Sequence, residues 1–295
     1  RVPAQVHGER RAANPSDFVP EALRIDKRPD LTDIIFGWGE EEGSPVPVWD
    51  RGDGKQKITQ YAGHVFFGDA RFTGAKDDIW YGRDAVIPQI LAGPKPTTFQ
   101  HYLAQNASAG HDPDVKAELA HYGTPRNETQ VRGYKLYWHK GSNPPFVADN
   151  LKRNEETGEF RNESQLTRIR PLQSCVRFTF DIRFENLRPE ELGALLWALA
   201  LPGEKDATYR HKIGMGKPLG LGAVAITPKL FLSQRQKRYQ HLFGDDNWHE
   251  PGDDDKVDIE TYLDAFTGYV LQVLGSKSRD FTALKRIRML LEMLR

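Results

Sequence analysis

Residues 176–185 read VRFTFDIRFE, and this stretch decides the fold class of the chain. Apolar side chains occupy the even positions from 176 to 184, and polar or charged side chains occupy the positions between them. Because successive side chains of a strand point to opposite faces, the alternation predicts a β-strand with one face on a core and the other in water.

The residues on either side predict further strands and a helix. Residues 63–70, GHVFFGDA, are rich in aromatic and β-branched side chains and predict an earlier strand. A proline and two acids at residues 189–191 suit the first turn of a helix, which Pro202-Gly203 ends. Residues 222–226 predict one more strand. Strand, helix, loop and strand in this order predict an α+β fold of the ferredoxin-like type.

The other regions predict an irregular insertion and a helical end. Residues 74–165 contain many turn signals, so a long irregular insertion is expected there, with one short helix at 113–122. Residues 233–295 are expected to form an acidic linker followed by two helices, at 259–274 and 280–294. The first of these helices carries an apolar stripe that predicts its core-packing face: Tyr262, Phe266, Tyr269, Val270 and Val273.

The charges balance overall but not locally. The chain has 295 residues with 41 Lys+Arg and 41 Asp+Glu. Residues 161–238 hold fourteen basic residues against seven acids, whereas residues 241–260 hold one against eight. A basic region beside an acidic one is compatible with binding a polyanion on one face, and equally with two solvated surfaces.

The composition excludes several classes of protein. A single cysteine, Cys175, excludes a disulfide framework and a multi-cysteine metal site, and its place at the start of an apolar strand predicts a buried thiol. The longest apolar runs are far shorter than the roughly 18–20 residues of a membrane span. The chain is therefore expected to be soluble and cytoplasmic, without a membrane partner. Its start at Arg1 predicts a fragment or a processed chain.

The most informative stretch for function is residues 209–222, YRHKIGMGKPLGLG. Its glycines let the backbone pass close to a ligand, and the basic residues among them suit phosphate oxygens. It is neither a P-loop, because Pro218 follows Lys217, nor a dinucleotide fingerprint, because Gly220 lies four residues after Gly216. Two interpretations are open: an anion-binding loop, or a crossover whose glycines only permit tight packing.

A second candidate is residues 132–140, RGYKLYWHK, in which basic and aromatic side chains interleave. This composition is typical of a surface that stacks bases and holds phosphates. The same residues also fit a strand whose inward face carries Tyr134, Leu136 and Trp138. Both interpretations are open.

Catalytic and metal-binding residues show no clear pattern. The histidines at 101, 111, 121 and 139 lack the spacing of a metal-binding motif, and the aspartates at 253–255 are expected in a solvated loop. No Gly-x-Ser-x-Gly motif is present. No tightly bound cofactor and no metal site are therefore predicted.

Several segments, taken in order, resemble the CRISPR-associated RAMP superfamily, particularly the backbone-type subunits of type III effector complexes. They are also similar to the last backbone module of the single-chain type III-E effector. The segments that carry the resemblance are IFGW at 35–38, GHVFFGDA at 63–70, PKPTTFQHYL at 94–103, RGYKLYWH at 132–139, FENL at 184–187, and residues 211–222.

The resemblance implies a modified RNA-recognition-motif fold over residues 1–232, which grips a guide RNA and presents it for pairing with a target RNA. Other RAMP subunits or modules would be its partners. The residues expected to contact RNA are Arg210, His211, Lys212, Gly214, Met215, Gly216, Lys217, Gly220 and Gly222, together with Lys95, Arg132, Lys135 and Trp138.

One part of the family pattern is missing. The first strand and helix of the fold, with the loop that carries the target-cleaving aspartate, are not found before Phe36. The chain is therefore not expected to be catalytic alone, although Mg²⁺ would serve target cleavage by a complete complex. Two alternatives to guide binding are kept: a metal-dependent ribonuclease, and a protein-interaction scaffold whose acidic stretch and terminal helices dock a partner.

Overall fold

The computed structural model divides the chain into two compact units. The first comprises residues 1–29, 39–60 and 91–136, and the second comprises residues 30–38, 61–90 and 137–295. The residues that the structure describes are 3–6, 9–20, 30–39, 60–74, 79–91, 93, 95, 97–105, 119–149, 151, 153, 155, 158, 160, 163–204, 206–233, 239 and 255–295.

The first unit contains short elements. Strands β1 (Pro3–Val6) and β2 (Glu9–Ala12) form an antiparallel hairpin, followed by the 3₁₀ helix η1 (Pro15–Phe18). A second 3₁₀ helix, η3 (Phe99–His101), leads to a bridge between Leu103 and Val131. Leu103 is fully buried, and buried Asp17 forms an ion pair with Arg126 at 3.4 Å.

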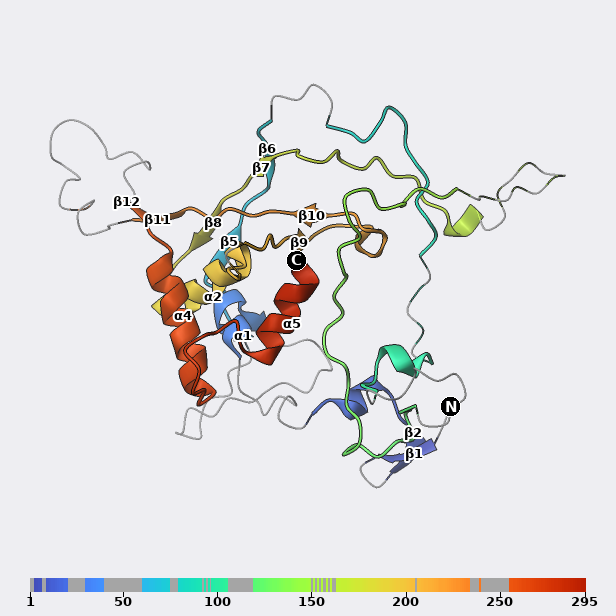
Figure 1. The fold of residues 1–295 in the computed structure, drawn as a ribbon, viewed down its shortest axis with the longest axis horizontal. Helices are drawn as coiled ribbons and strands as arrows, with labels where there is room; N and C mark the ends of the chain where they lie inside the picture. The colour runs from blue at the N-terminus through green and yellow to red at the C-terminus, as the bar shows by residue number, and fades with distance from the viewer. Residues whose placement is uncertain are drawn as a thin grey trace. The chain divides into compact units, whose positions relative to one another are not determined.

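A long antiparallel ribbon is the main β-structure of the second unit. Strand β5 (Val65–Phe67) pairs with β8 (Ile182–Phe184), and β6 (Arg71–Phe72) pairs with β7 (Phe178–Thr179). Bridges from Trp80 to Leu172 and from Val86 to Ile169 continue the same pairing beyond β6 and β7 (Figure 1). The strand predicted at 63–70 is thus confirmed in shorter form as β5, and the strand predicted at 176–185 is confirmed in two pieces, β7 and β8.

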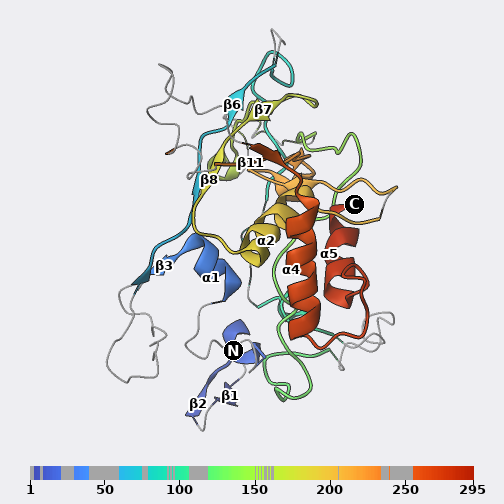
Figure 2. The same ribbon diagram turned by 90° about the vertical axis from the view of Figure 1, so that its left-hand side faces the viewer.

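The larger core of this unit lies between helices. Helix α2 (Pro189–Ala200) packs along α4 (Glu260–Val273), and the two lie beside each other in both ribbon views (Figures 1 and 2). The turn before α5 (Lys285–Leu294) and α5 itself complete the cluster with β11 (Leu230–Leu232), which pairs with β12 (Asp255–Val257). Its buried members are Leu192, Leu196, Trp197, Leu230, Leu263, Phe281 and Leu291.

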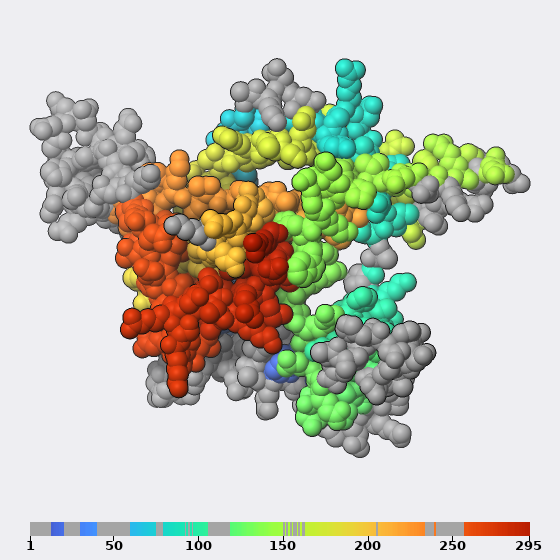
Figure 3. All heavy atoms as spheres, in the orientation of Figure 1, coloured from blue at the N-terminus to red at the C-terminus, as the bar shows by residue number. Residues whose placement is uncertain are grey.

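The helices predicted from residue 189 and at 259–274 are confirmed, the helix predicted at 280–294 is confirmed over Lys285–Leu294, and the predicted core-packing face of α4 is confirmed in part. Tyr262, Phe266 and Val270 of the predicted stripe pack against the core, whereas Tyr269 and Val273 are exposed and Leu263, outside the stripe, is buried. Helix α2 approaches α4 at Tyr262 and Phe266, because Gly193 leaves room for the Tyr262 carbonyl and the Phe266 Cβ. In Figure 3 the atoms of α4 and α5 form a continuous surface on this side of the unit.

A smaller core joins α1 (Leu31–Phe36) to the ribbon through Ile35, Val65 and Leu195. Asp30 caps α1, because its carboxylate accepts hydrogen bonds from the backbone N–H groups of Thr32 and Asp33 at 2.8 and 2.9 Å. Burial opposes ionisation of Asp30, but these bonds and that of the Thr32 hydroxyl hold its pKa below the ordinary 3.8.

The described sheets are small. Strands β3 (Trp38–Gly39) and β4 (Gln60–Tyr61) form one pair, and β9 (His211–Lys212) and β10 (Ala223–Val224) form another. Every sheet in the described ranges has two strands, so the chain is mixed α and β, and the ferredoxin-like sandwich stays a prediction. The predicted division at residue 232 stays a prediction too.

Other predictions fare differently. The expected irregular insertion contains isolated bridges and the 3₁₀ helices η3 and η5 (Glu163–Gln165), while residues 113–118 of its predicted helix lie outside the described residues. The prediction of a buried thiol is wrong: Cys175 is exposed, because it lies in a left-handed turn of the ribbon with φ of 64°. Among the described helices, none combines the length and apolar character needed to traverse a bilayer.

Candidate nucleic-acid interface

The glycine-rich stretch forms the loop of a β-hairpin. In the β9–β10 pair, Lys212 faces Ala223 and His211 faces Val224, and the Ile213 N–H donates to the Gly222 carbonyl at 2.9 Å. Between these strands the loop makes one 3₁₀ turn, η6 (Lys217–Leu219). We call residues 211–224 the glycine hairpin. The strand predicted at 222–226 is therefore confirmed in shorter form.

All four glycines of the loop have left-handed backbone conformations, with φ of 75° at Gly214, 72° at Gly216, 95° at Gly220 and 74° at Gly222. A Cβ at Gly222 would lie 1.9 Å from the Ile213 carbonyl oxygen, so no side chain fits there. A Cβ at Gly214 would have no atom within 4 Å. Tight packing thus explains Gly222, whereas Gly214 leaves open space beside the backbone.

A distant segment of the same unit lies against the hairpin. A Cβ at Gly220 would lie 2.6 Å from Pro144 and 3.1 Å from the Cβ of Lys140. The Nε2–H of His139 donates to the Arg210 carbonyl at 3.1 Å, since a carbonyl oxygen can only accept. The structure therefore brings the end of the second candidate stretch, residues 137–144, onto the first.

This contact places two lysines together. Burial lowers the pKa of Lys212 below the ordinary 10.5, and the positive charge of Lys140 lowers it further. The Lys212 ammonium donates to the Gly220 carbonyl at 3.4 Å. We call Lys140 and Lys212 the lysine pair.

No described carboxylate neutralises the lysine pair. The ion pairs within the described ranges join Arg126 to Asp17 and Arg295 to Glu204. Residues 207–232 contain no Asp or Glu at all, and neither do residues 137–148. The hairpin and the segment against it therefore form a surface with an excess of positive charge, which suits an anionic ligand.

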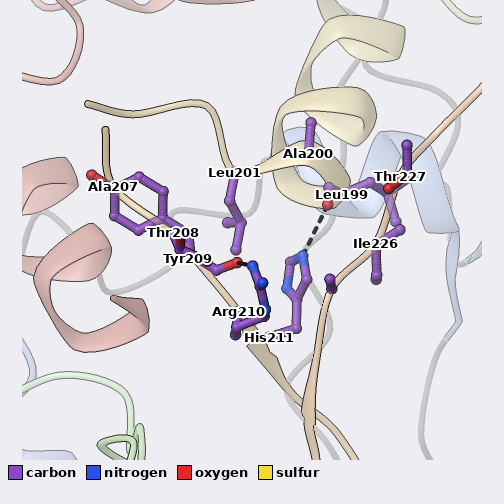
Figure 4. A pocket seen from close by; sticks show the side chains of 11 residues that line it. Leu199, Ala200, Leu201, Ala207, Thr208, Tyr209, Arg210, His211, Ile226 and Thr227 are labelled. Carbon is purple, nitrogen blue, oxygen red and sulfur yellow. Dashed lines mark hydrogen bonds between the residues drawn. The ribbon is translucent and has the colours of Figure 1, made fainter. Parts of the chain in front are cut away.

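Arg210 and His211 lie in an open pocket of about 440 Å³ between the end of α2 and the hairpin (Figure 4). The Nε2–H of His211 donates to the Leu199 carbonyl at 2.9 Å, and an Arg210 N–H donates to the Tyr209 carbonyl at 2.8 Å. The Arg210 backbone N–H also donates to the Leu294 carbonyl at 2.7 Å. These bonds attach β9 to α2 and to the end of α5, so the hairpin projects from a fixed base.

Large apolar side chains in both candidate stretches are exposed. Met215 at the hairpin is 85% exposed, and Trp138 is 58% exposed. The interpretation of residues 134, 136 and 138 as the inward face of a strand is wrong, because Tyr134 is 92% exposed and Leu136 is also exposed. No described strand includes these residues.

The remaining predicted contacts fall in the first unit. Lys95 accepts through its carbonyl from the Thr98 N–H, and the Arg132 guanidinium donates to the Gln100 carbonyl at 3.2 Å. Lys135 is exposed in the same unit. These three residues belong to another unit than the glycine hairpin, while Lys140, which the prediction omitted, lies against the hairpin in the same unit.

Comparison with known proteins identifies no relative: no protein-family model matches this chain, and no curated protein sequence does. The described residues contain no group of three or more His, Cys, Asp or Glu side chains placed to hold a metal ion.

Proposed function

We propose that this chain binds single-stranded RNA through the glycine hairpin, as the guide-RNA-binding module of a type III RNA-guided effector. The observation that carries the proposal is the lysine pair: Lys140 and Lys212 both lie against Gly220 of the glycine loop, with no described carboxylate to neutralise them. An RNA phosphate would supply the missing negative charge.

The shape of the loop supports the same ligand. The left-handed glycines keep side chains off the backbone, so a phosphodiester chain can approach its N–H groups. The exposed Met215 and Trp138 provide apolar area for bases beside the cations. Guide binding, the modified RNA-recognition-motif fold and a target RNA as partner come to this proposal from the sequence resemblance.

The binding test measures the affinity of a short single-stranded RNA at increasing salt. Replacing both lysines, Lys140→Gln with Lys212→Gln, removes two phosphate contacts, so the log–log salt slope is expected to become shallower by about 1.4. The matched control is Lys277→Gln with Lys285→Gln, which removes equal charge from exposed positions away from the hairpin. Equal loss of affinity in both double variants would show a nonspecific effect of net charge and contradict the proposal.

The guide itself is tested by purifying the protein expressed with its native neighbouring genes and sequencing the RNA that accompanies it. The expected result is a short, uniform RNA with a constant repeat-derived end. A folded complex that carries no RNA would contradict the proposal.

A further inference from the structure

We propose that Trp138 and the lysine pair form a subsite for a single nucleotide, in which the two ammonium groups hold its phosphate and the indole stacks on its base. We call these three residues the nucleotide subsite. The proposal rests on the proposed RNA binding and names the part of the RNA that the hairpin recognises.

The phosphate half of the subsite follows from the lysines. Lys140 and Lys212 come from segments about 70 residues apart, yet their charges repel each other across the contact at Gly220. An ammonium group has three donors, and the Gly220 carbonyl takes one of those of Lys212. A phosphate between the two lysines would accept hydrogen bonds from both and remove the repulsion.

The base half follows from the position of Trp138. It precedes Lys140 by two residues, so their Cα atoms are at most about 7.6 Å apart, a distance that one nucleotide can span. Between them, the hydrogen bond from the His139 side chain to the Arg210 carbonyl attaches this segment to the residue before β9. The indole is nevertheless 58% exposed, so it offers a held aromatic surface to a base.

The backbone of the glycine hairpin is open at Gly214. Gly214 has no neighbouring atom within 4 Å of its missing Cβ, and the backbone there adopts the left-handed conformation. A free phosphate would need only the cations, whereas a nucleotide uses the aromatic plane as well. The aromatic contribution therefore separates the two ligands.

The experiment compares two probes, a short single-stranded RNA and an abasic phosphodiester chain of the same length, on the intact protein. Trp138→Ala is expected to weaken RNA binding by about fivefold to about 150-fold, the range of one stacked base. It should leave binding of the abasic chain unchanged, whereas Lys140→Gln with Lys212→Gln should weaken both probes. The matched control is Tyr269→Ala, which removes an exposed aromatic ring of α4 and should change the binding of neither probe.

A spectroscopic signal provides a second readout. RNA should quench the fluorescence of the wild-type protein more than that of Trp138→Phe, because the stacked indole is lost while an aromatic ring stays. Equal quenching, or an equal effect of Trp138→Ala on both probes, would overturn the nucleotide subsite. If RNA still binds through the lysines in that case, only the subsite fails; if the wild-type protein binds neither probe, the proposed function fails with it.

Discussion

The contact between α2 and α4 depends on a single glycine, and replacing it is the most direct test of the helical core. Gly193 is buried in the middle of α2, where a glycine lowers helix stability by about 1 kcal/mol relative to alanine. By helix propensity alone, Gly193→Ala should stabilise the protein. The structure predicts the opposite.

The magnitude follows from the distances around the missing Cβ. A Cβ at Gly193 would lie 2.0 Å from the Tyr262 carbonyl oxygen and 2.8 Å from the Cβ of Phe266, whereas ordinary contact begins at 3.4 Å. The obstacle is backbone, so a rotamer change cannot remove it and the helices must separate by about 1 Å or more. Overpacking of this kind costs about 1–3 kcal/mol. Because displaced Phe266 also packs on Trp197 and Phe281, we expect a cost at the upper end of this range, which leaves a net loss of about 2 kcal/mol in the free energy of unfolding after the gain in helix propensity.

The assay is denaturant unfolding followed by far-ultraviolet circular dichroism, with the free energy of unfolding compared between variants. The matched control is Gly268→Ala in α4, where a Cβ would meet no atom within 4 Å. That change should stabilise the protein by about 0.5–1 kcal/mol. If Gly193→Ala stabilises to the same extent as Gly268→Ala, the close packing of the two helices is refuted.

Three further predictions concern the cap of α1 and the glycine hairpin. Asp30→Ala should lower the free energy of unfolding by about 1 kcal/mol near neutral pH. Because the pKa of Asp30 is lowered in the folded state, this difference in stability between wild type and variant should be complete above the unfolded-state pKa. It should disappear as pH falls through the folded-state pKa. Acid denaturation curves of the two proteins that stay parallel would contradict this expectation. Burial and the charge of Lys140 lower the pKa of Lys212 below the ordinary 10.5, so RNA affinity should decline as pH rises through this lowered pKa. Lys212→Arg should abolish the decline in binding titrations, because arginine keeps its charge. Gly214→Ala should lower the free energy of unfolding by about 1–2 kcal/mol, because the residue has a positive φ. Gly222→Ala should lower it further, because the new Cβ would also meet the Ile213 backbone. Equal denaturation midpoints of the two variants would exclude this difference.

Local patterns in the sequence predicted the elements of the second unit well. The alternation at 176–184 depends only on which residues neighbour each other along the strand, and the start of α2 is marked by Pro189 with two acids after it. Such signals name an element without naming its partner. The partner of β8 is β5, about 115 residues earlier, and no residue of either strand encodes that distance.

The candidate site was predicted in its loop but not in its surroundings. The glycines identified the loop, because positive φ values favour glycine at each of its four positions, but not that the loop closes a hairpin. Lys140 was missed because its proximity to Lys212 arises from tertiary packing of residues 137–144. The core-packing face of α4 was predicted in part, since Tyr262, Phe266 and Val270 pack against the core, whereas Leu263 was missed and Tyr269 and Val273 are exposed.

The ribbon of the second unit has a consequence for how the chain reaches this structure. Its pairs, such as Val65 with Phe184, close a loop of about 120 residues, and the whole segment 91–136 of the first unit lies inside that loop. The entropy cost of closing so long a loop arises before the strands gain any free energy from pairing, so we expect the ribbon to form late and slowly during folding. Once the loop is long, however, doubling its length adds only about 0.6 kcal/mol of entropy cost. The enclosed segment is therefore a place where insertions and deletions cost the ribbon little, whereas a shift of one residue within the ribbon itself would turn Val65 out of the core.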